Sequence, residues 1–546
     1  MIVEMLAAAA VGWVPADLVI ENARIWSDGL GGFARFAAVE DGHFVHVGAP
    51  DPAYVGPGTQ RLDAGGRVVI PGLIDSHVHM LGGGAGLGQL QLRDARDKAD
   101  FVRRVADRAE RLAAEGDPDA WIRGGRWSTE SWDERVQPTK EWVDEVSGDH
   151  PLFLPRMDGH SALVNSRALA LAGITEDTPP DPEGGVIDRD PRTGEPTGIL
   201  RESAMGLVAS RIPTESVNDR VSALRAAMRE ANRHGVTAVA DIPGIDDLAV
   251  YERLGPSDLT VRFFLYPTAD DWASAARDAR AFAGRPGWVR VNGLKTYLDG
   301  SLGSRTAYMR EPFLCNEPGR PEWRGLLREG VAGGRLEDNV LAAQRAGLQT
   351  IAHAIGDEAN HLLLETLVAI YPDLPAARCR SEHAQHLLRE DIARFGALGV
   401  IASMQPYHKS DDGRYAEEYI GHERCASSYA FKSLLDAGAV VAFGSDWPVV
   451  SINPFLGVEA AVTGRTLDGK AWQTQENITV AEALRCYTSR AAYAVFAEDE
   501  IGRIAPGYRA DFLVLDRSPF DPGVAWADIR PLAVYVEGRA VYAAEP

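Results

Sequence analysis

The sequence is poor in cysteine, has fewer basic than acidic residues, and lacks any long apolar run. The few cysteines form no Cys-x-x-Cys pair and have no neighbours typical of a nucleophile, which indicates reduced, buried thiols rather than a disulfide framework or a redox site. They are Cys315, Cys379, Cys425 and Cys486. Because no apolar run reaches the length needed to cross a bilayer, we expect no membrane-spanning segment.

The charge balance excludes whole classes of partner. The chain has 56 Lys and Arg against 78 Asp and Glu, a net charge of -22. Nucleic acids and anionic membranes bind basic patches, so we expect neither as a partner. The first 14 residues include a short apolar stretch but no Lys or Arg ahead of it. A signal peptide requires such a basic start, and we therefore expect a cytoplasmic protein.

The length of 546 residues suggests more than one structural unit. Alternating apolar and polar residues near both ends of the chain predict β-hairpins. We expect residues 1–65 and 500–546 to form one β-sandwich and residues 66–499 to form the larger domain. Within the latter, residues 81–215 are too long for a structureless loop, and we predict a subdomain inserted over the site.

Eight short apolar runs alternate with helical segments, as parallel strands joined by crossover helices do. Helices are predicted over 216–235 and 333–347, and each ends in glycine. The strands are predicted over 66–77, 235–242, 261–267, 288–295, 348–353, 378–383, 399–405 and 439–446. The fold class is therefore α/β, a distorted TIM (β/α)8 barrel, with the site at the carboxyl ends of its strands.

Six polar residues stand where predicted strands end. In "PGLIDSHVHM", two histidines lie two residues apart, so in a strand they point to the same side. A lone His or Asp is more often structural than catalytic, but the shared position at strand ends favours a common site. The six are His77, His79, Lys295, His353, His383 and Asp446. Four imidazoles and a carboxylate predict a divalent metal site, with zinc the first choice.

Lys295 is unusual in such a set because a protonated ammonium would be repelled by a metal. Burial could make the amine neutral, or the amine could react with carbon dioxide to form an anionic carbamate. A carbamate has two oxygens and could bridge two ions. The alternative is a surface or salt-bridged lysine, but the segment "WVRVNGLKTY" is too apolar for that.

The ordered motifs resemble those of the amidohydrolase superfamily, and more narrowly its YtcJ-like branch with the N-substituted formamide deformylases. They are "PGLIDSHVHM", "GLKTYLDGSLGSRTAYM", "IAHAIGD", "SEHAQHL", "SMQPYH", "AFGSDWPV" and "IGRIAPGYRADFLVLD". The resemblance runs from about residue 16 to 540. It implies a distorted TIM barrel with a β-sandwich from both termini, and a metal-dependent hydrolase with a carboxylated lysine.

The resemblance also implies roles for the six residues. His77, His79 and Asp446 would bind the more buried ion, and Lys295 would bridge to a second ion held by His353 and His383. Whether one or two ions are bound is left open. A metal lowers the pKa of bound water from about 16 to roughly 7, so that it can attack a carbonyl. Asp446 is expected to take the proton from water and pass it to the departing amine.

Other residues are candidates for substrate contact. His160 and His408 lie in segments that resemble loops at the mouth of the site, and either could donate a hydrogen bond to the oxyanion, although a structural role is as well supported. Four further candidates are Trp447 and Gln405 in the pocket wall, and Asp299 and Arg305 after the Lys295 strand. Most tryptophans of the insertion are expected in its own core, with one or two over an apolar pocket. They are Trp121, Trp127, Trp132 and Trp142.

The function predicted is a metal-dependent amidohydrolase acting on a non-peptide C–N bond of a small, apolar substrate. A deaminase, or a hydrolase of cyclic amides, carbamates or esters, could use the same centre. A metal-free scaffold would lack ligands, and none is missing. The glycine-rich stretches "GLGGFARF" and "GGGAGLG" do not lie between a strand and a helix as a dinucleotide site requires. A homo-oligomer, such as a dimer, is left open.

Overall fold

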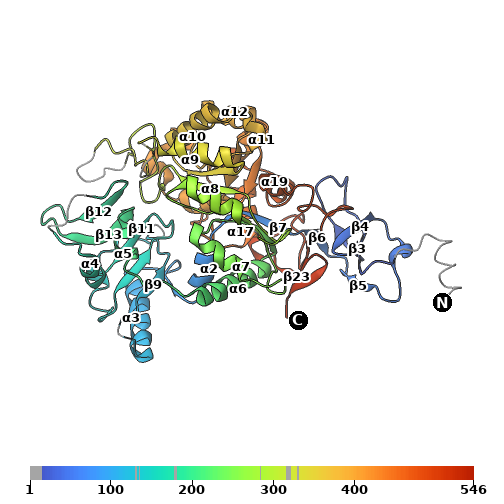
Figure 1. The fold of residues 1–546 in the computed structure, drawn as a ribbon, viewed down its shortest axis with the longest axis horizontal. Helices are drawn as coiled ribbons and strands as arrows, with labels where there is room; N and C mark the ends of the chain where they lie inside the picture. The colour runs from blue at the N-terminus through green and yellow to red at the C-terminus, as the bar shows by residue number, and fades with distance from the viewer. Residues whose placement is uncertain are drawn as a thin grey trace.

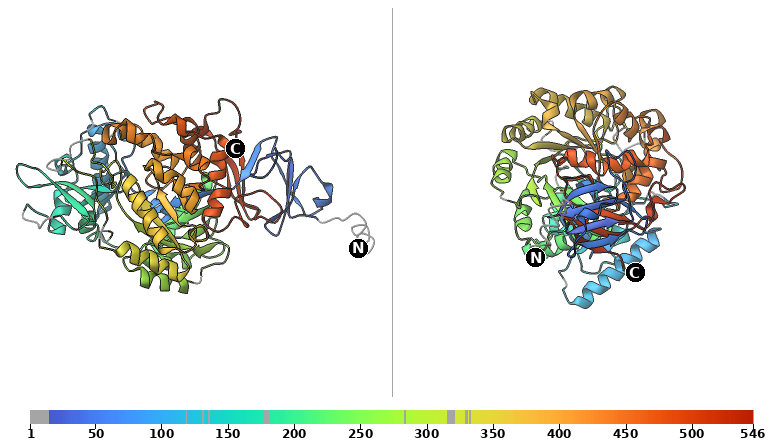
Figure 2. Two further views of the ribbon diagram at one scale, coloured as in Figure 1. Left: turned by 90° about the horizontal axis from the view of Figure 1, so that it is seen from above. Right: turned by 90° about the vertical axis from the view of Figure 1, so that its right-hand side faces the viewer.

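The computed structural model describes residues 15–117, 119–129, 132–134, 136–176, 181–282, 284–314, 321–328, 331 and 333–545. Cys315 and the first 14 residues lie outside these ranges. Figure 1 shows three groups of elements along the long axis of the molecule. Parallel strands surrounded by helices occupy the middle, the inserted segment lies at one end, and strands from both chain termini lie at the other. Figure 2 shows the same succession from above.

Strands from both ends of the chain build two small sheets that pack on each other. The first has the order β4-β3-β1-β5, and the second has the order β2-β6-β22-β23-β24. Their bounds are β1 Leu18–Glu21, β2 Arg24–Ile25, β3 Phe36–Glu40, β4 His43–Gly48, β5 Gln60–Asp63, β6 Val68–Pro71, β22 Phe512–Leu515, β23 Pro531–Val536 and β24 Arg539–Ala543. Ile20, Phe44, Val69 and Phe512 share one buried cluster between them. The predicted meeting of the two termini is confirmed, while the division into domains stays a prediction.

The eight predicted strand runs all contain strands, and these pair in parallel. They form two sheets, with the orders β16-β15-β14-β7 and β17-β18-β19-β20-β21. Their bounds are β7 Leu73–Val78, β14 Val236–Asp241, β15 Arg262–Leu265, β16 Val289–Val291, β17 Gly293–Tyr297, β18 Gln349–Ala354, β19 Arg380–His383, β20 Ile401–Met404 and β21 Val441–Phe443. The α/β class is confirmed, but no continuous ladder closes these sheets into one barrel.

The division arises within the run predicted over 288–295. Asn292 separates β16 from β17, and its side chain donates to the carbonyl of Val495 at 2.6 Å. Gly293 then begins the pairing with β18, where a Cβ atom would collide with the carbonyl of Gln349. At the opposite edges, β7 and β21 are linked beyond their ends, since Asp446 donates its backbone N–H to the carbonyl of His77 at 2.7 Å.

Helices cover the parallel sheets, and two of them are those predicted from sequence. α6 (Val217–Arg233) begins with a capping box made by Ser216 and Asp219. α9 (Arg335–Ala346) ends at Gly347, whose φ of 66° suits glycine. The other helices of this part are α2 Met80–Gly86, α7 Leu248–Glu252, α8 Trp272–Ala281, α10 Asp357–Ile370, α11 Leu374–Ala377, α12 Arg389–Leu398, α13 Pro406–Asp412, α14 Ala416–Ile420, α15 His422–Cys425, α16 Phe431–Asp436, α17 Pro454–Thr463, α18 Val480–Cys486 and α19 Ser489–Ala494.

The inserted segment has a sheet and a core of its own, with the strand order β12-β13-β11-β10-β9-β8. Its elements are β8 Leu90–Gln91, β9 Ile122–Gly125, β10 Leu152–Pro155, β11 Ser161–Val164, β12 Gly185–Arg189, β13 Pro196–Glu202, α3 Lys98–Glu115, α4 Ser166–Ala172 and α5 Met205–Ala209. Trp127 and Trp132 are buried with Phe101, Trp142 stacks on Trp132, and Trp121 packs against a second cluster. The tryptophans therefore form the core of the insertion, as predicted.

Among the residues that the structure describes, no helix combines the length and the apolar character that a membrane crossing requires.

Candidate metal centre

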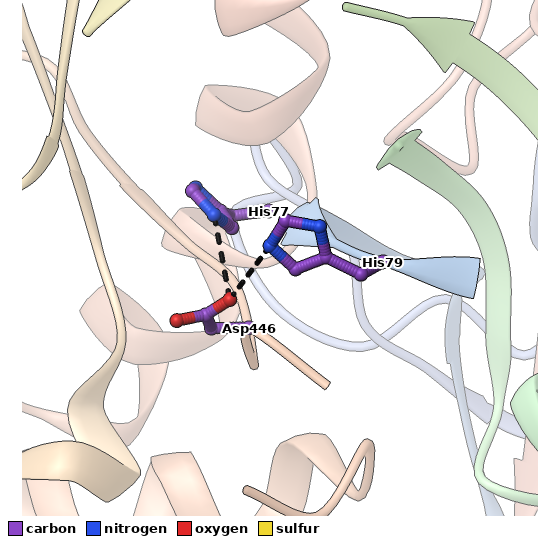
Figure 3. A group of neighbouring side chains, drawn as sticks. All are labelled: His77, His79 and Asp446. Atoms are coloured by element: carbon purple, nitrogen blue, oxygen red, sulfur yellow. Dashed lines mark ion pairs between the residues drawn. The ribbon is translucent and has the colours of Figure 1, made fainter. Parts of the chain in front are cut away.

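The six side chains predicted as metal ligands line one cavity of about 350 Å³. They come from opposite edges of the two parallel sheets and from strands between them: His77 lies in β7 and His79 follows it, Lys295 lies in β17, His353 in β18 and His383 in β19, and Asp446 follows β21. Figure 3 shows His77, His79 and Asp446, with both imidazoles directed at the Asp446 carboxylate. The strand ends therefore bring together residues that are far apart in sequence.

Unusual backbone conformations at two strand ends help to aim the side chains. His383 has a φ of 77° and Asp446 a φ of 58°, values that non-glycine residues rarely adopt. Such conformations cost of order 1–3 kcal/mol each and are often found at functional sites. Gly444 permits β21 to approach β7, because a Cβ there would lie 2.5 Å from the backbone nitrogen of His77.

His77, His79 and Asp446 face one another within ion-pair distance (Figure 3). Oδ1 of Asp446 lies 3.1 Å from Nε2 of His79 and 3.5 Å from Nε2 of His77. The other ring nitrogen of each imidazole already has an acceptor: Nδ1 of His77 donates to Glu382, and Nδ1 of His79 donates to the carbonyl of Ile242 at 3.3 Å. Both Nε2 atoms therefore present lone pairs to a carboxylate oxygen.

His353, His383 and Lys295 make the other side of the cluster. The ring centroids of His353 and His383 are 4.5 Å apart. Nε2 of His353 donates to the carbonyl of Gly300 at 2.9 Å, and Nδ1 of His383 donates to Oε1 of Gln405 at 2.7 Å. Each ring thus keeps one nitrogen free. Lys295 is 1% exposed, and its buried Nζ has no hydrogen-bond partner among the described residues.

Burial sets the protonation states of this cluster. It lowers the pKa of His77, His353 and His383 well below the ordinary value, so these imidazoles are neutral at pH 7. It also lowers the pKa of Lys295 to about 8. Burial would raise the pKa of Asp446, but the positive charge that His77 and His79 carry in their protonated forms outweighs it and lowers that pKa below the usual range. Neutral imidazoles and an ionised carboxylate are the forms that bind metals.

The donor set fits a divalent cation. His77 Nε2, Lys295 Nζ and Asp446 Oδ1 are buried polar atoms that lack a hydrogen-bond partner in the described part of the chain. Unsatisfied buried groups are costly, and lone pairs facing a carboxylate oxygen repel unless a cation lies between them. Ligand atoms of His77, His79 and Asp446, and separately of His383, His408 and Asp446, lie within 4.8 Å of one another. Nitrogen and carboxylate ligands of this kind suit zinc and related metals.

His160 and His408 both line the cavity. Nδ1 of His408 lies 3.2 Å from the amide nitrogen of Gln385, which donates to it, so the proton is on Nε2, a buried atom without a partner among the described residues. Burial lowers the pKa of His408 to about 4. For His160, burial alone would lower the pKa, but the carboxylate of Glu202, 3.0 Å from Nδ1, outweighs it and the pKa is raised. Both rings can donate to a ligand in the cavity.

Four residues predicted to contact substrate lie behind the cavity wall rather than on it. The buried carboxylate of Asp299 accepts backbone N–H groups from Tyr308, Ile355 and Gly356, and burial raises its pKa to about 7. Gln405 holds the His383 ring. The backbone carbonyl of Arg305 accepts a hydrogen bond from the indole N–H of Trp323 at 2.6 Å. Trp447 lies in a buried hydrophobic cluster, and its ring packs against Gly83 of α2. Their contact with substrate stays a prediction.

Sequence analysis missed several charged residues at the site. Glu382 is fully buried between His77 and Arg380, whose Nε donates to it at 2.7 Å. Glu202 accepts from His160 and from Arg328 at 2.6 Å. The sequence did contain one signal for Glu382, because it is an acidic residue directly before the predicted ligand His383 in "RSEHAQ". Nothing in the sequence pattern of the insertion pointed to Glu202, or to Arg126, which also lines the cavity.

Comparison with known families decides the family of the chain, because the pattern of the amidohydrolase family matches residues 60–542. The chain belongs to the amidohydrolase family. It is 37% identical to the protein LONG AFTER FAR-RED 3 of Arabidopsis thaliana, over 97% of this chain and 92% of that protein. It is 31% identical to YtcJ of Bacillus subtilis, over 88% of this chain and 90% of that protein. The predicted YtcJ-like resemblance is thus confirmed.

Two further similarities bear on activity and fold. An N-substituted formamide deformylase of Arthrobacter pascens is 27% identical, over 96% of this chain and 98% of that enzyme. Among solved structures, an uncharacterized metal-dependent hydrolase from Pyrococcus horikoshii matches with a TM-score of 0.72 at 25% identity, over 94% of this chain and 99% of that one. The chain therefore shares its overall fold with a metal-dependent hydrolase.

Proposed function

We propose that this amidohydrolase, on a distorted (β/α)8 barrel, hydrolyses an amide or formamide-type C–N bond of a small substrate with the aid of a divalent metal, zinc first. The observation that carries the proposal is the group formed by His77, His79 and Asp446, in which two imidazole lone pairs face a carboxylate oxygen at 3.1 and 3.5 Å. The similarity to a deformylase of N-substituted formamides supports the choice of a non-peptide C–N bond.

A divalent ion in this centre would supply a water molecule acidic enough to attack a carbonyl at neutral pH. Asp446 is ionised and 7% exposed at the floor of the cavity, so it is placed to accept a proton from the attacking water. After the attack, the same carboxyl group can return that proton to the nitrogen of the departing amine. One residue thus acts as base and then as acid, which amide cleavage requires because an unprotonated amine leaves poorly.

His408 and His160 are proposed to bind the carbonyl oxygen of the substrate. His408 lines the cavity, its buried Nε2–H has no partner among the described residues, and the ring is neutral because burial lowers its pKa. His160 is held by Glu202, and its ring centroid lies 5.0 Å from that of His353. Donors fixed in this way stabilise the negative charge that develops on the oxygen in the transition state.

Lys295 is proposed to be carboxylated. Burial lowers the pKa of its amine to about 8, which increases the fraction of neutral amine at pH 7. The neutral nitrogen can attack the carbon of carbon dioxide, form an N–C bond and release one proton to solvent. The resulting carbamate carries a negative charge and two oxygens, and it would give the buried, unpartnered Nζ position the anionic ligand that an ammonium cannot provide.

The test begins with metal content and turnover of the purified protein. We expect bound zinc or a similar ion, hydrolysis of at least one member of a panel of N-formyl, N-acyl and cyclic amides, and loss of turnover after chelation that added zinc or manganese restores. His79→Ala should lose metal and activity, whereas His422→Ala, at a side chain that is 85% exposed, should lose neither. A metal-free protein that cleaves these amides, or turnover indifferent to chelators, would overturn the proposal.

A further inference from the structure

Two neighbouring arginines, Arg126 in the cavity wall and Arg93 close to it, have no acidic partner among the residues that the structure describes. Among the residues that the structure describes, no hydrogen bond or ion pair reaches the guanidinium of Arg126, which lines the metal cavity with His79 and Asp446. The nearby Arg93 donates to the backbone carbonyl of Val449 and pairs with no carboxylate in that part of the chain. Arg93 lies close enough to Arg126 to lower its pKa. Two like charges without an acid between them form a binding site for an anion.

The position of Arg126 is fixed by the insertion. The residue follows β9 and has a φ of 56°, an unusual conformation for an arginine. Its backbone N–H donates to the carbonyl of Pro155 at 2.8 Å, and the next residue, Trp127, is anchored through its indole N–H to the carbonyl of Leu154 at 2.8 Å. The chain is thus held on both sides of Arg126, whose side chain lines both the metal cavity and the neighbouring one.

Arg126 differs from other arginines near the cavity in having no acidic partner among the described residues. Arg328 also lines the cavity but donates to Glu202 at 2.6 Å, and Arg156 beside it pairs with Asp158. Burial lowers the pKa of Arg126 to about 10, which leaves it a cation at pH 7. A half-buried, unpaired cation costs free energy until an anion binds.

The charge of Asp446 raises the pKa of Arg126, yet Asp446 makes no ion pair with Arg126 within 4.0 Å. Its Oδ1 instead faces His79 and His77. Among the residues that the structure describes, no acid pairs with Arg126, so its guanidinium is available to an anion in the cavity. It would bind on the insertion side of the cavity, above the predicted metal ligands.

We propose that Arg126 binds a carboxylate of the substrate, so that the enzyme acts on amides that carry an acidic group a short distance from the scissile bond. This rests on the proposed function, because it names the substrate class of the same site. A guanidinium matches a carboxylate through two parallel N–H donors, which gives orientation as well as affinity. The rest of the substrate would contact Leu302, Ile355 and Val450, apolar residues in the same cavity.

The carboxylate could belong to the amine half or to the acyl half of the substrate, and two matched pairs of compounds distinguish these cases. N-formylphenylalanine and N-formyl-2-phenylethylamine differ by a carboxylate on the amine side. N-benzylsuccinamic acid and N-benzylbutanamide differ by a carboxylate on the acyl side. We expect the metal-loaded enzyme to show a higher kcat/KM for the acidic member of at least one pair.

Variants then assign the preference to Arg126. In Arg126→Gln, the ratio of kcat/KM between the acidic and neutral members should fall roughly 10- to 100-fold, since a hydrogen-bonded charge pair is lost. Arg126→Lys should keep part of the ratio. Arg123→Gln is the matched control: it lies three residues earlier, pairs with Glu215 at 2.8 Å, and lines a neighbouring cavity instead. It should leave the ratio unchanged.

The outcomes separate this inference from the proposed function. If the enzyme cleaves amides but prefers neither acidic compound, or if Arg126→Gln keeps the wild-type ratio while it unfolds at the wild-type temperature, the inference is overturned and the proposed function stands. If the enzyme cleaves none of the four compounds and no other amide of the panel, the proposed function fails. Calorimetry with the same intact compounds then decides the inference: tighter binding of an acidic member, lost in Arg126→Gln, supports it, and equal binding overturns it.

Discussion

Glu382 accepts a hydrogen bond from Nδ1 of His77 across 305 residues of sequence, with both side chains fully buried. Arg380 donates to the other oxygen of the same carboxylate at 2.7 Å. This chain of three residues fixes the tautomer of His77 and leaves its Nε2 free to bind metal. Hydrogen bonds of this kind orient metal-binding histidines and raise their basicity.

Glu382→Gln should therefore weaken metal binding. We expect the affinity for zinc to fall roughly 10- to 100-fold, in line with other losses of partners behind metal ligands. Competition with a chelator of known affinity, read by elemental analysis, measures the change. Glu365→Gln is the control, because that side chain is 56% exposed and pairs only on the surface with Arg394. Equal zinc affinity in Glu382→Gln and the wild type would show that His77 does not depend on this contact.

Asp446→Asn tests the proton transfer. The amide of asparagine can still contact His79 but accepts protons poorly, so we expect most metal to remain while kcat falls roughly 10²- to 10⁴-fold. Metal content and steady-state rates on the amide substrate are measured in the same preparation. Asp436→Asn, on a side chain that is 63% exposed, should have wild-type values. Wild-type turnover in Asp446→Asn would remove Asp446 from the role of base and acid.

Lys295→Ala tests the carbamate. The variant should lose metal and activity together, and short carboxylic acids such as acetate or propionate should restore part of both, because they can occupy the space of the missing anion. The same acids should not raise the activity of the wild type. In the wild type grown or incubated with ¹³C-bicarbonate, we expect a carbamate signal by NMR. Full activity in Lys295→Ala, or a wild type without that signal, would argue against a bridging carbamate.

His386 provides a test of pH-dependent stability away from the metal ligands. Its Nδ1 contacts the hydroxyl of Ser428 at 2.7 Å, and burial lowers its pKa to about 3. In the unfolded chain His386 therefore takes up a proton near pH 6.5, whereas in the folded protein it stays neutral down to about pH 3. Its contribution to the free energy of unfolding is complete above pH 6.5 and is lost as the pH falls toward 3. Between pH 7 and pH 5 this amounts to about 2 kcal/mol.

The prediction is read from His386→Gln, which lacks the titrating group. Relative to the wild type, the free energy of unfolding of His386→Gln should rise by about that amount when the pH is lowered from 7 to 5. Denaturant unfolding at both pH values measures it, and His422→Gln, at an exposed imidazole, should show no such change. Parallel pH dependence of His386→Gln and the wild type would mean that His386 titrates normally in the folded state.

Much of the centre could be predicted from sequence because its signals are local. A strand shows its two-residue period and its apolar run within a few residues, and the polar residue that ends it marks the carboxyl edge. The runs that contain β7, β18, β19 and β21 were recognisable in this way, and so were the ligands at their ends.

The sequence by itself determined which segments become strands and which side chains stand at their ends, since those properties depend on neighbours along the chain. Only the tertiary structure decided which distant groups meet: Glu382 behind His77, Glu202 behind His160, and Arg126 of the insertion facing Asp446 without an ion pair. It also divided the parallel strands at Asn292. Contacts of this kind depend on how the sheets and the insertion pack against one another. A local pattern of apolar and polar residues cannot predict them, because it does not specify which distant residue each side chain will contact.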